Sequence, residues 1–284
     1  MRSRALYIVA DSGSIRSAAL SEPLAVQAVI RSVLSVQGFK IKKMKIAQIT
    51  DLHLCDGLAE CFQINSKNNI NKIFEDIKTE NIDMLIFTGD FGSVEGIEYL
   101  NKKLKELKIE YYVVLGNHDK KENLIENGII DNSYLCDRTI IKDEFIIHLL
   151  DSSKGYLDDI QIENICNQIN VNKKNILFTH YPIIKSNRNV LDREFGMKLT
   201  QEQFNKIINL YIDISCGHFH CYTESKINKI KQVTCPAAIM QIGEKDNKII
   251  TESFQFGYNI IEIKNKEIQY KPKLFVGSGV IPKE

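Results

Sequence analysis

The chain has 284 residues, of which 44% are hydrophobic, so it can bury one large core and carry a short appendage. Its 37 basic and 36 acidic residues give a net charge of +1, which argues against a nucleic-acid partner and leaves any attraction for an anionic substrate to bound metal ions. Seven cysteines without paired spacing indicate free thiols in a reducing compartment, and no apolar run reaches the roughly 18 residues of a membrane span. We therefore expect a cytoplasmic protein without a membrane span, with a homodimer as a possible assembly.

Residues 1–43 differ in composition from the rest of the chain, because Ala, Ser, Val and Arg give way to Ile, Asn and Lys beyond them. Four interpretations stay open: an upstream leader or wrongly assigned start, an organellar transit peptide, a secretory signal, and the beginning of a LysR-type helix-turn-helix, which residues 9–26 resemble. Asp11 and Glu22 weaken the transit peptide, and the secretory signal lacks an adequate apolar region. We expect a peripheral extension of one or two helices, followed by one domain over residues 44–284.

The first part of this domain alternates apolar runs with helical periods. We predict strands over residues 45–50, 83–88 and 111–115, separated by helices over residues 70–77 and 94–107. This β-α-β-α-β order implies parallel strands with right-handed crossovers.

The second part of the domain continues the same pattern with more strands. We predict a short helix over 120–127, a hairpin of 139–142 with 145–150, a helix over 158–169, a strand over 175–179, a loop over 185–199 near the mouth of the site, a helix over 200–210 and strands from 211 onward. The chain is therefore predicted to fold as a four-layer α/β/β/α sandwich of two mixed sheets flanked by helices.

Five polar clusters each follow an apolar run that is predicted to be a strand. They contain Asp51 and His53, Asp90, Asn117 to Asp119, His180, and His218 and His220. Because the carboxyl ends of parallel strands meet at one edge of a sheet, we expect these side chains to converge. Each of them taken singly could be a turn residue or a structural histidine, but seven metal-ligating residues in order at strand ends are not explained that way.

Two polar residues inside predicted strands are interpreted differently. His148, the sixth histidine, lies in an apolar strand and is expected to be structural. Asp213 interrupts another strand and is expected to face solvent.

The order D-x-H, G-D, G-N-H-D, H, G-H-x-H resembles that of the calcineurin-like metallophosphoesterase superfamily, over residues 44–275. After Gly217 the chain is most similar to class III cyclic-nucleotide phosphodiesterases, in which a strand pair, a Pro-small-small segment (here 236–238) and a closing strand (here 258–263) follow the double histidine. The resemblance implies a dinuclear metal site whose ligands match the superfamily pattern without substitution.

By this resemblance the ligands divide between two metal ions. Asp51, His53 and His220 would hold the first ion, Asn117, His180 and His218 the second, and Asp90 would bridge them. His118, on the other side of an extended backbone, would face the substrate and stabilise the transition state or protonate the leaving alkoxide. Imidazole exchanges protons near neutral pH, which suits either role. Asp119 would orient these groups from behind the ligands.

Two divalent ions about 3.5–4 Å apart neutralise a phosphodiester and activate water, so the resemblance implies a metal-bridging hydroxide as the nucleophile. Ligation by histidine, carboxylate and amide suits Mn²⁺, Fe²⁺ or Zn²⁺. The expected function is hydrolysis of a small phosphodiester, with 3′,5′-cyclic nucleotides (cyclic AMP) favoured. The alternatives are glycerophosphodiesters, nucleotide-linked lipid precursors or phosphomonoesters as substrates, and a non-catalytic binding scaffold with the same fold.

Overall fold

The computed structural model describes residues 43–134, 137–142, 144–210, 212–264 and 267–282. The predicted extension, residues 1–43, lies outside these ranges except for its last residue, so its helices and its role stay predictions.

One mixed sheet has five strands in the order β13-β12-β1-β2-β3. Its strands are β1 (Met44–Ile49), β2 (Met84–Thr88), β3 (Tyr111–Val114), β12 (Phe256–Lys264) and β13 (Glu267–Phe275). β1, β2 and β3 are parallel, whereas β12 runs antiparallel to β1 and β13 antiparallel to β12. Side chains alternate between its faces, so Ile46 points into one core and Ala47 into another.

The second mixed sheet has six strands in the order β4-β5-β6-β7-β9-β8. Its strands are β4 (Arg138–Ile141), β5 (Phe145–Leu149), β6 (Lys174–Phe178), β7 (Ile212–Cys216), β8 (Thr223–Ile227) and β9 (Ile230–Thr234). The central strands β5, β6, β7 and β9 are parallel, and the two edges pair antiparallel. A separate antiparallel ribbon consists of β10 (Gln241–Lys245) and β11 (Lys248–Ser253).

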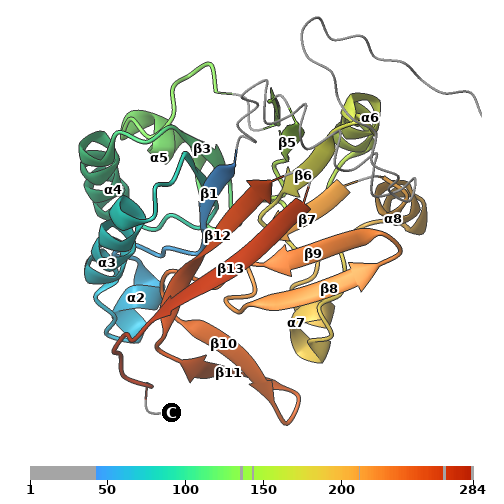
Figure 1. Ribbon diagram of the computed structural model, residues 1–284. Coiled ribbons are helices and arrows are strands. Elements are labelled where there is room, and N and C mark those ends of the chain that lie inside the picture. Colours follow the sequence, from blue (N-terminus) through green and yellow to red (C-terminus); the bar gives the residue numbers. More distant parts are fainter. Residues whose placement is uncertain (1–42, 135–136, 143, 211, 265–266, 283–284) are drawn as a thin grey trace, which may run out of the picture. The chain divides into compact units, whose positions relative to one another are not determined.

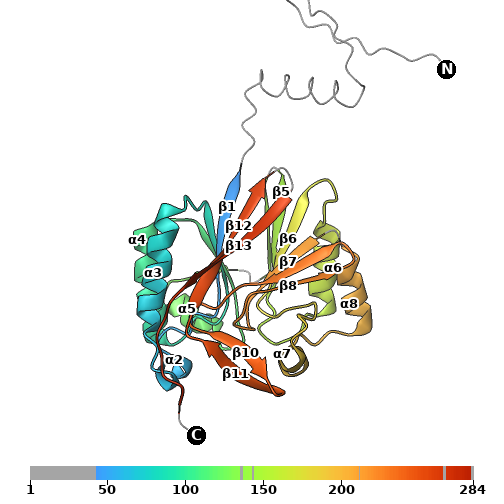
Figure 2. The ribbon, with the colours of Figure 1, turned by 60° about the horizontal axis from the view of Figure 1, so that its bottom comes forward.

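Helices cover the outer face of each large sheet, as Figures 1 and 2 show. α3 (Ser66–Thr79) and α4 (Val94–Leu107) pack on the five-stranded sheet, and α6 (Asp159–Gln168) and α8 (Gln201–Ile208) pack on the six-stranded sheet. Three shorter helices, α2 (Gly57–Cys61), α5 (Lys121–Glu126) and α7 (Asn189–Glu194), lie in the loops.

A third apolar core lies between the two sheets. Ile46 and Ile86 of the first sheet pack there with Ile147 and Ile176 of the second, and all four are almost completely buried. Burial of this kind contributes roughly 25 cal/mol for each Å² of apolar surface removed from water. The order of layers is therefore helix, sheet, sheet, helix, which confirms the predicted four-layer sandwich.

Residues 185–199 were predicted to form a loop, but the structure has the helix α7 within this segment. A helix of six residues makes fewer than two turns, which is too short for a periodic apolar pattern. The Asp192 carboxylate accepts hydrogen bonds from the backbone that precedes the helix, and Leu191 packs against Phe219 from another part of the chain. Contacts made outside the helix therefore stabilise it.

The two polar residues inside strands have different outcomes. His148 is buried, with its ring nitrogens 3.2 Å from Thr139 Oγ1 and 3.3 Å from Asn175 Oδ1, in agreement with a structural role. The prediction for Asp213 was wrong: the residue is 7% exposed, and its carboxylate forms an ion pair with Lys174 at 2.9 Å. The ion pair allows a charged group to lie at the edge of a core.

Among the described residues, none of the helices combines the length and the apolar character that crossing a lipid bilayer would require.

Candidate metal centre

Two groups of acidic and imidazole side chains lie beyond the carboxyl ends of the parallel strands. One group contains Asp51, His53 and His220, which follow β1 and β7; the other contains Asp90, His180 and His218, which follow β2, β6 and β7. Within each group the potential ligand atoms lie within 4.8 Å of one another. All of these side chains except His218, which is half-buried, are buried.

Asp90 lies between the two groups. Its Oδ2 atom is 3.4 Å from Nε2 of His180 and 3.7 Å from Nε2 of His53. Asn117, the seventh predicted ligand, is exposed, and its Oδ1 atom is 3.0 Å from the same nitrogen of His180. The structure therefore brings together all seven residues that the sequence predicts as ligands. Their assignment as ligands stays a prediction.

Five of the seven adopt the left-handed backbone conformation, with φ between 44° and 71°: Asp51, His53, Asp90, His218 and His220. For a residue with a side chain this conformation costs of the order of 1–3 kcal/mol, and such strain concentrates at functional sites. Each strand ends and the chain turns at once, which directs the side chains back towards the strand ends. Hydrogen bonds between loops hold the turns in place, such as that from Asp51 N to Gly89 O at 2.9 Å.

Two glycines in the motifs are required by close packing between loops. A Cβ atom on Gly116 would lie 2.1 Å from Oδ1 of Asp90, and one on Gly217 would lie 1.9 Å from Oγ1 of Thr50. Both distances are too short for any side chain. The glycines of the G-N-H-D and G-H-x-H motifs therefore allow loops from different strands to meet around the centre.

Hydrogen bonds behind the ligands fix the orientation of two imidazoles. Nδ1 of His180 is 2.7 Å from the carbonyl oxygen of Thr88, so it carries a proton and donates it, which turns Nε2 towards Asp90. Nδ1 of His53 is 2.6 Å from Oδ2 of Asp56, and a hydrogen bond between these two atoms fixes the orientation of the His53 ring. Asp56 was not among the residues predicted from the sequence. The available signal is an Asp-Gly pair three residues after His53, where Asp56 caps α2.

Asp119 contacts the backbone of the loops that carry the ligands, and its predicted orienting role stays a prediction. Its carboxylate accepts hydrogen bonds from the backbone nitrogens of Gly116, Asp90 and Phe91, at 2.7–2.8 Å. These bonds connect the loop after β3 to the loop after β2. Asp119 therefore holds the backbone of Asp90 without contacting its carboxylate.

The electrostatics of the centre favour ionised carboxylates. Burial would lower the pKa of His180, but the neighbouring Asp90 raises it to about 9. Burial would raise the pKa of Asp51, but His220 lowers it to about 2. Burial also opposes ionisation of Asp90, yet His180 and His53 hold the pKa of that carboxyl well below its usual range. The pKa of His218 is lowered to about 3, by burial and by the charge of His180.

These residues fit a bound cation. Three buried side-chain atoms, Oδ1 of Asp51, Nε2 of His218 and Nδ1 of His220, have no hydrogen-bond partner among the described residues, which is costly for buried polar atoms. Nε2 of His180 and Nδ1 of His218 also face each other at 3.1 Å. Since His180 donates through its other nitrogen, this facing nitrogen is a lone-pair atom when the ring is neutral. A neutral His180 therefore presents this lone pair to a cation.

His118 lies on the other side of the centre from Asn117. Its exposed ring has its centroid 5.4 Å from that of His53, in the first group, whereas Asn117 contacts the second group. The two residues therefore diverge, as predicted. The reason given was wrong, because residues 117–118 form a turn and are not extended. The backbone nitrogen of His118 donates to Oδ1 of Asp90 at 2.9 Å, which fixes this turn.

Aromatic side chains form a wall beside the second group. The ring of Tyr181 lies 4.0 Å from that of His218, measured between centroids, and Phe195 at the end of α7 lies 6.2 Å from it. Phe195 is 42% exposed, so its ring is accessible beside the second group. Phe219, in contrast, is completely buried and packs with Leu191.

We expect divalent metal to stabilise the fold in a pH-dependent way. Mn²⁺ at about a hundred times its Kd adds about 2.7 kcal/mol if it binds only the folded chain, which should raise the Tm of the EDTA-treated protein by about 5–10 °C. The pKa of His180 is raised from 6.5 to about 9, so the proton on this ring stabilises the metal-free fold fully below about pH 6.5. This contribution to stability is lost as the pH rises through about 9. Because the metal replaces this proton, the rise in Tm should grow between pH 6.5 and pH 8. Differential scanning calorimetry measures it, and a rise that shrinks over this window contradicts the prediction.

Residues 44–222 match the sequence model of the calcineurin-like phosphoesterase family. The chain is 29% identical to a "probable cyclic nucleotide phosphodiesterase" of Vesicomyosocius okutanii over 214 residues, which cover 70% of this chain and 88% of that protein. It is 28% identical to a protein of the same description from Coxiella burnetii over 230 residues, 76% of this chain and 91% of the other. A "probable glycerophosphodiester phosphodiesterase" of Arcobacter nitrofigilis is 28% identical over 180 residues, 56% of this chain and 64% of the other.

Solved structures share the fold at low sequence identity. A purple acid phosphatase from yellow lupin superimposes with a TM-score of 0.60 at 12% identity, over 85% of this chain and 54% of that one. A dimetal phosphatase from Danio rerio superimposes with a TM-score of 0.57 at 10% identity, over 83% of this chain and 99% of the other. At these identities the likeness concerns the fold alone.

Proposed function

Because this chain belongs to the calcineurin-like phosphoesterase family, we propose that it is a metal-dependent phosphodiesterase whose substrate is a 3′,5′-cyclic nucleotide, with cyclic AMP favoured. The observation that carries the proposal is the pair of ligand groups on either side of Asp90. Relatives described as cyclic nucleotide phosphodiesterases, aligned over most of the chain, support the choice of a diester and of this substrate class.

In this proposal the seven predicted ligands hold two divalent ions, Mn²⁺, Fe²⁺ or Zn²⁺, divided as the sequence analysis assigns them. When bound, two such ions neutralise the phosphate oxygens and make water nucleophilic. The chain's own residues prepare this chemistry: Thr88 and Asp56 hold the Nδ1 protons of His180 and His53, which leaves both Nε2 atoms free to bind. The predicted hydroxide nucleophile is part of the proposal.

The proposed role of His118 is to act on the ester oxygen that leaves. Its ring is exposed beside the first group, and its backbone is fixed by Asp90. An imidazole in this position can donate a proton to a leaving alkoxide or stabilise the negative charge that develops on the phosphate.

A second candidate substrate class is supported by one observation. The Arcobacter relative is described as a glycerophosphodiesterase, although the match covers a smaller share of both chains. A glycerophosphodiester is also a small diester and would use the same ligand groups. The expectations of a cytoplasmic location and of a homodimer stay predictions, and light scattering on the purified chain would test the second.

The test is hydrolysis by the purified full chain, treated with EDTA and then supplied with Mn²⁺. We expect turnover of cyclic AMP and of bis-p-nitrophenyl phosphate, with at most slow turnover of the monoester p-nitrophenyl phosphate. Turnover of glycerophosphocholine but not of cyclic AMP would transfer the proposal to the second substrate class. No turnover of any ester, despite bound metal, would favour the non-catalytic scaffold.

A further inference from the structure

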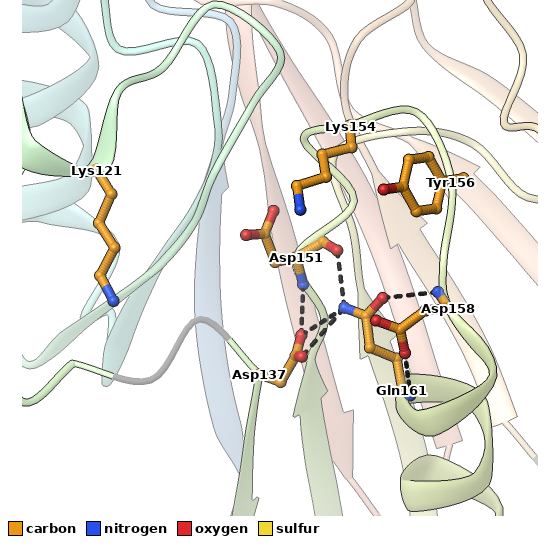
Figure 3. Close-up of a pocket in the computed structure, with 7 residues that line it drawn as sticks. All are labelled: Lys121, Asp137, Asp151, Lys154, Tyr156, Asp158 and Gln161. Carbon is orange, nitrogen blue, oxygen red and sulfur yellow. Dashed lines mark hydrogen bonds between the residues drawn. The ribbon is translucent and has the colours of Figure 1, made fainter.

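A polar cavity of about 380 Å³ lies at the edge of the sheets where the metal centre lies. Figure 3 shows Lys121 of α5 on one side, Lys154 and Tyr156 of the β5–α6 loop on the other, and Asp151 between them. Its volume is within the range of about 300–1,000 Å³ that is typical of small-molecule sites.

The loop that lines this cavity is attached to the second ligand group. Asp151 follows β5 directly, and the hydroxyl of the next residue, Ser152, accepts a hydrogen bond from the backbone nitrogen of His180 at 3.0 Å. A Cβ atom on Gly155 would contact the ring of Tyr181 at 3.5 Å, and that ring lies at a tilt against His218, with the ring centroids 4.0 Å apart. The loop that lines the cavity therefore also contacts residues of the second ligand group.

The floor of the cavity is already hydrogen-bonded and is rigid. Nε2 of Gln161 donates to both carboxylate oxygens of Asp137 and to the backbone carbonyl of Asp151, at 2.9–3.1 Å (Figure 3). Oε1 of Gln161 accepts from the backbone of Asp158, whose side chain caps α6. These bonds position the walls of the cavity.

The walls, in contrast, present groups without partners. Within the described part of the chain, the side chains of Lys154 and Tyr156 form no hydrogen bond or ion pair, and Tyr156 is 45% exposed. Among the described residues, Lys121 Nζ donates one hydrogen bond, to the carbonyl oxygen of Tyr134. Asp151 adds a carboxylate that points into the cavity (Figure 3); its Oδ1 atom accepts from the backbone nitrogen of Ser153 at 2.9 Å, and its second oxygen is available to a ligand. The cavity thus offers a flat aromatic ring together with ammonium donors and one carboxylate acceptor.

This combination matches a nucleoside. Any nucleobase can stack on an aromatic ring, whichever polar groups the base carries. A ribose hydroxyl can accept a hydrogen bond from an ammonium group and donate one to a carboxylate. A glycerol ester could use the polar groups but would leave the exposed ring of Tyr156 unmatched.

We propose that this cavity binds the nucleoside part of the substrate, with Tyr156 stacking on the base and with Lys154 and Asp151 binding the ribose 2′-hydroxyl, the one hydroxyl that a 3′,5′-cyclic nucleotide leaves free. The inference rests on the proposed function, since it places the nucleoside of a cyclic nucleotide beside the centre that would bind its phosphate. In this arrangement Tyr156 is a specificity-determining residue and has no role in bond cleavage.

Adenosine, which has no phosphate, tests the cavity separately from catalysis. By isothermal titration calorimetry with the full chain, we expect Tyr156→Ala and Lys154→Ala to weaken adenosine binding by about tenfold or more. Tyr156→Phe keeps the stacking face and should bind within about twofold of the unaltered chain. The matched control is Lys102→Ala, which removes an exposed lysine on α4 and should leave binding unchanged. Equal binding by all variants, or no binding by the unaltered chain, overturns the inference.

Hydrolysis distinguishes this inference from the proposed function. With Tyr156→Ala, the KM for cyclic AMP should rise about tenfold with little change in kcat, while turnover of bis-p-nitrophenyl phosphate stays within about twofold. A chain that hydrolyses cyclic AMP without any dependence on Tyr156 refutes the cavity and leaves the proposed function intact. A chain that binds adenosine through Tyr156 but does not hydrolyse cyclic AMP supports the cavity and refutes that substrate.

Discussion

Asp90→Asn is expected to lower kcat for bis-p-nitrophenyl phosphate by at least about a thousandfold, which corresponds to about 4 kcal/mol of transition-state stabilisation. Asparagine has nearly the same shape, tolerates the left-handed backbone at this position, and can still accept from His118 N. It lacks the negative charge that faces both His53 and His180. The variant should therefore bind fewer than two equivalents of Mn²⁺ while remaining folded.

Metal content by mass spectrometry, together with initial rates, tests this prediction. The matched control is Asp246→Asn, because Asp246 also has a positive φ but is exposed in the turn between β10 and β11. It should keep full activity and two equivalents of metal. If Asp90→Asn retained two equivalents and more than about a tenth of the activity, Asp90 would not be the bridging ligand.

His118→Ala is expected to separate two kinds of leaving group. If His118 donates a proton to the leaving oxygen, kcat for cyclic AMP should fall by about 10²–10⁴-fold, because its leaving group is an alkoxide. The fall for bis-p-nitrophenyl phosphate should be much smaller, about tenfold or less, because p-nitrophenolate leaves without protonation. Metal content should not change, since the side chain is exposed and belongs to neither ligand group.

The remaining outcomes are equally informative. An equal fall for both substrates would assign His118 to stabilising charge on the phosphate, the other predicted role. Unchanged rates for both would remove it from the catalytic machinery. The KM for each substrate indicates whether binding of the intact diester is also affected.

The class of fold and the convergence of the polar clusters could be predicted from local patterns, whereas the roles of the residues at the centre were implied by the resemblance to the metallophosphoesterase superfamily. Short continuous apolar runs followed by Asp51, Asp90 and His180 are enough to indicate buried parallel strands with polar residues at their carboxyl ends. Parallel strands must all present those ends at one edge, so the convergence of the side chains follows from connectivity. The strand and helix boundaries agree with prediction mostly to within two residues, because each element is long enough to show its own period.

Only the tertiary structure decided the features that depend on contacts between distant segments. One such feature is α7, where Leu191 packs against Phe219. Another is the burial of Asp213 beside Lys174. In both cases the partner is more than 25 residues away in the sequence, so no local pattern contains it. The cavity beside the centre is another such feature, because its two walls come from α5 and from the β5–α6 loop. A sequence pattern shows which residues follow a strand, but the space between two loops depends on how the layers pack. For this protein, the chemistry of the centre was determined by the sequence itself, and the space available to its substrate by the packing.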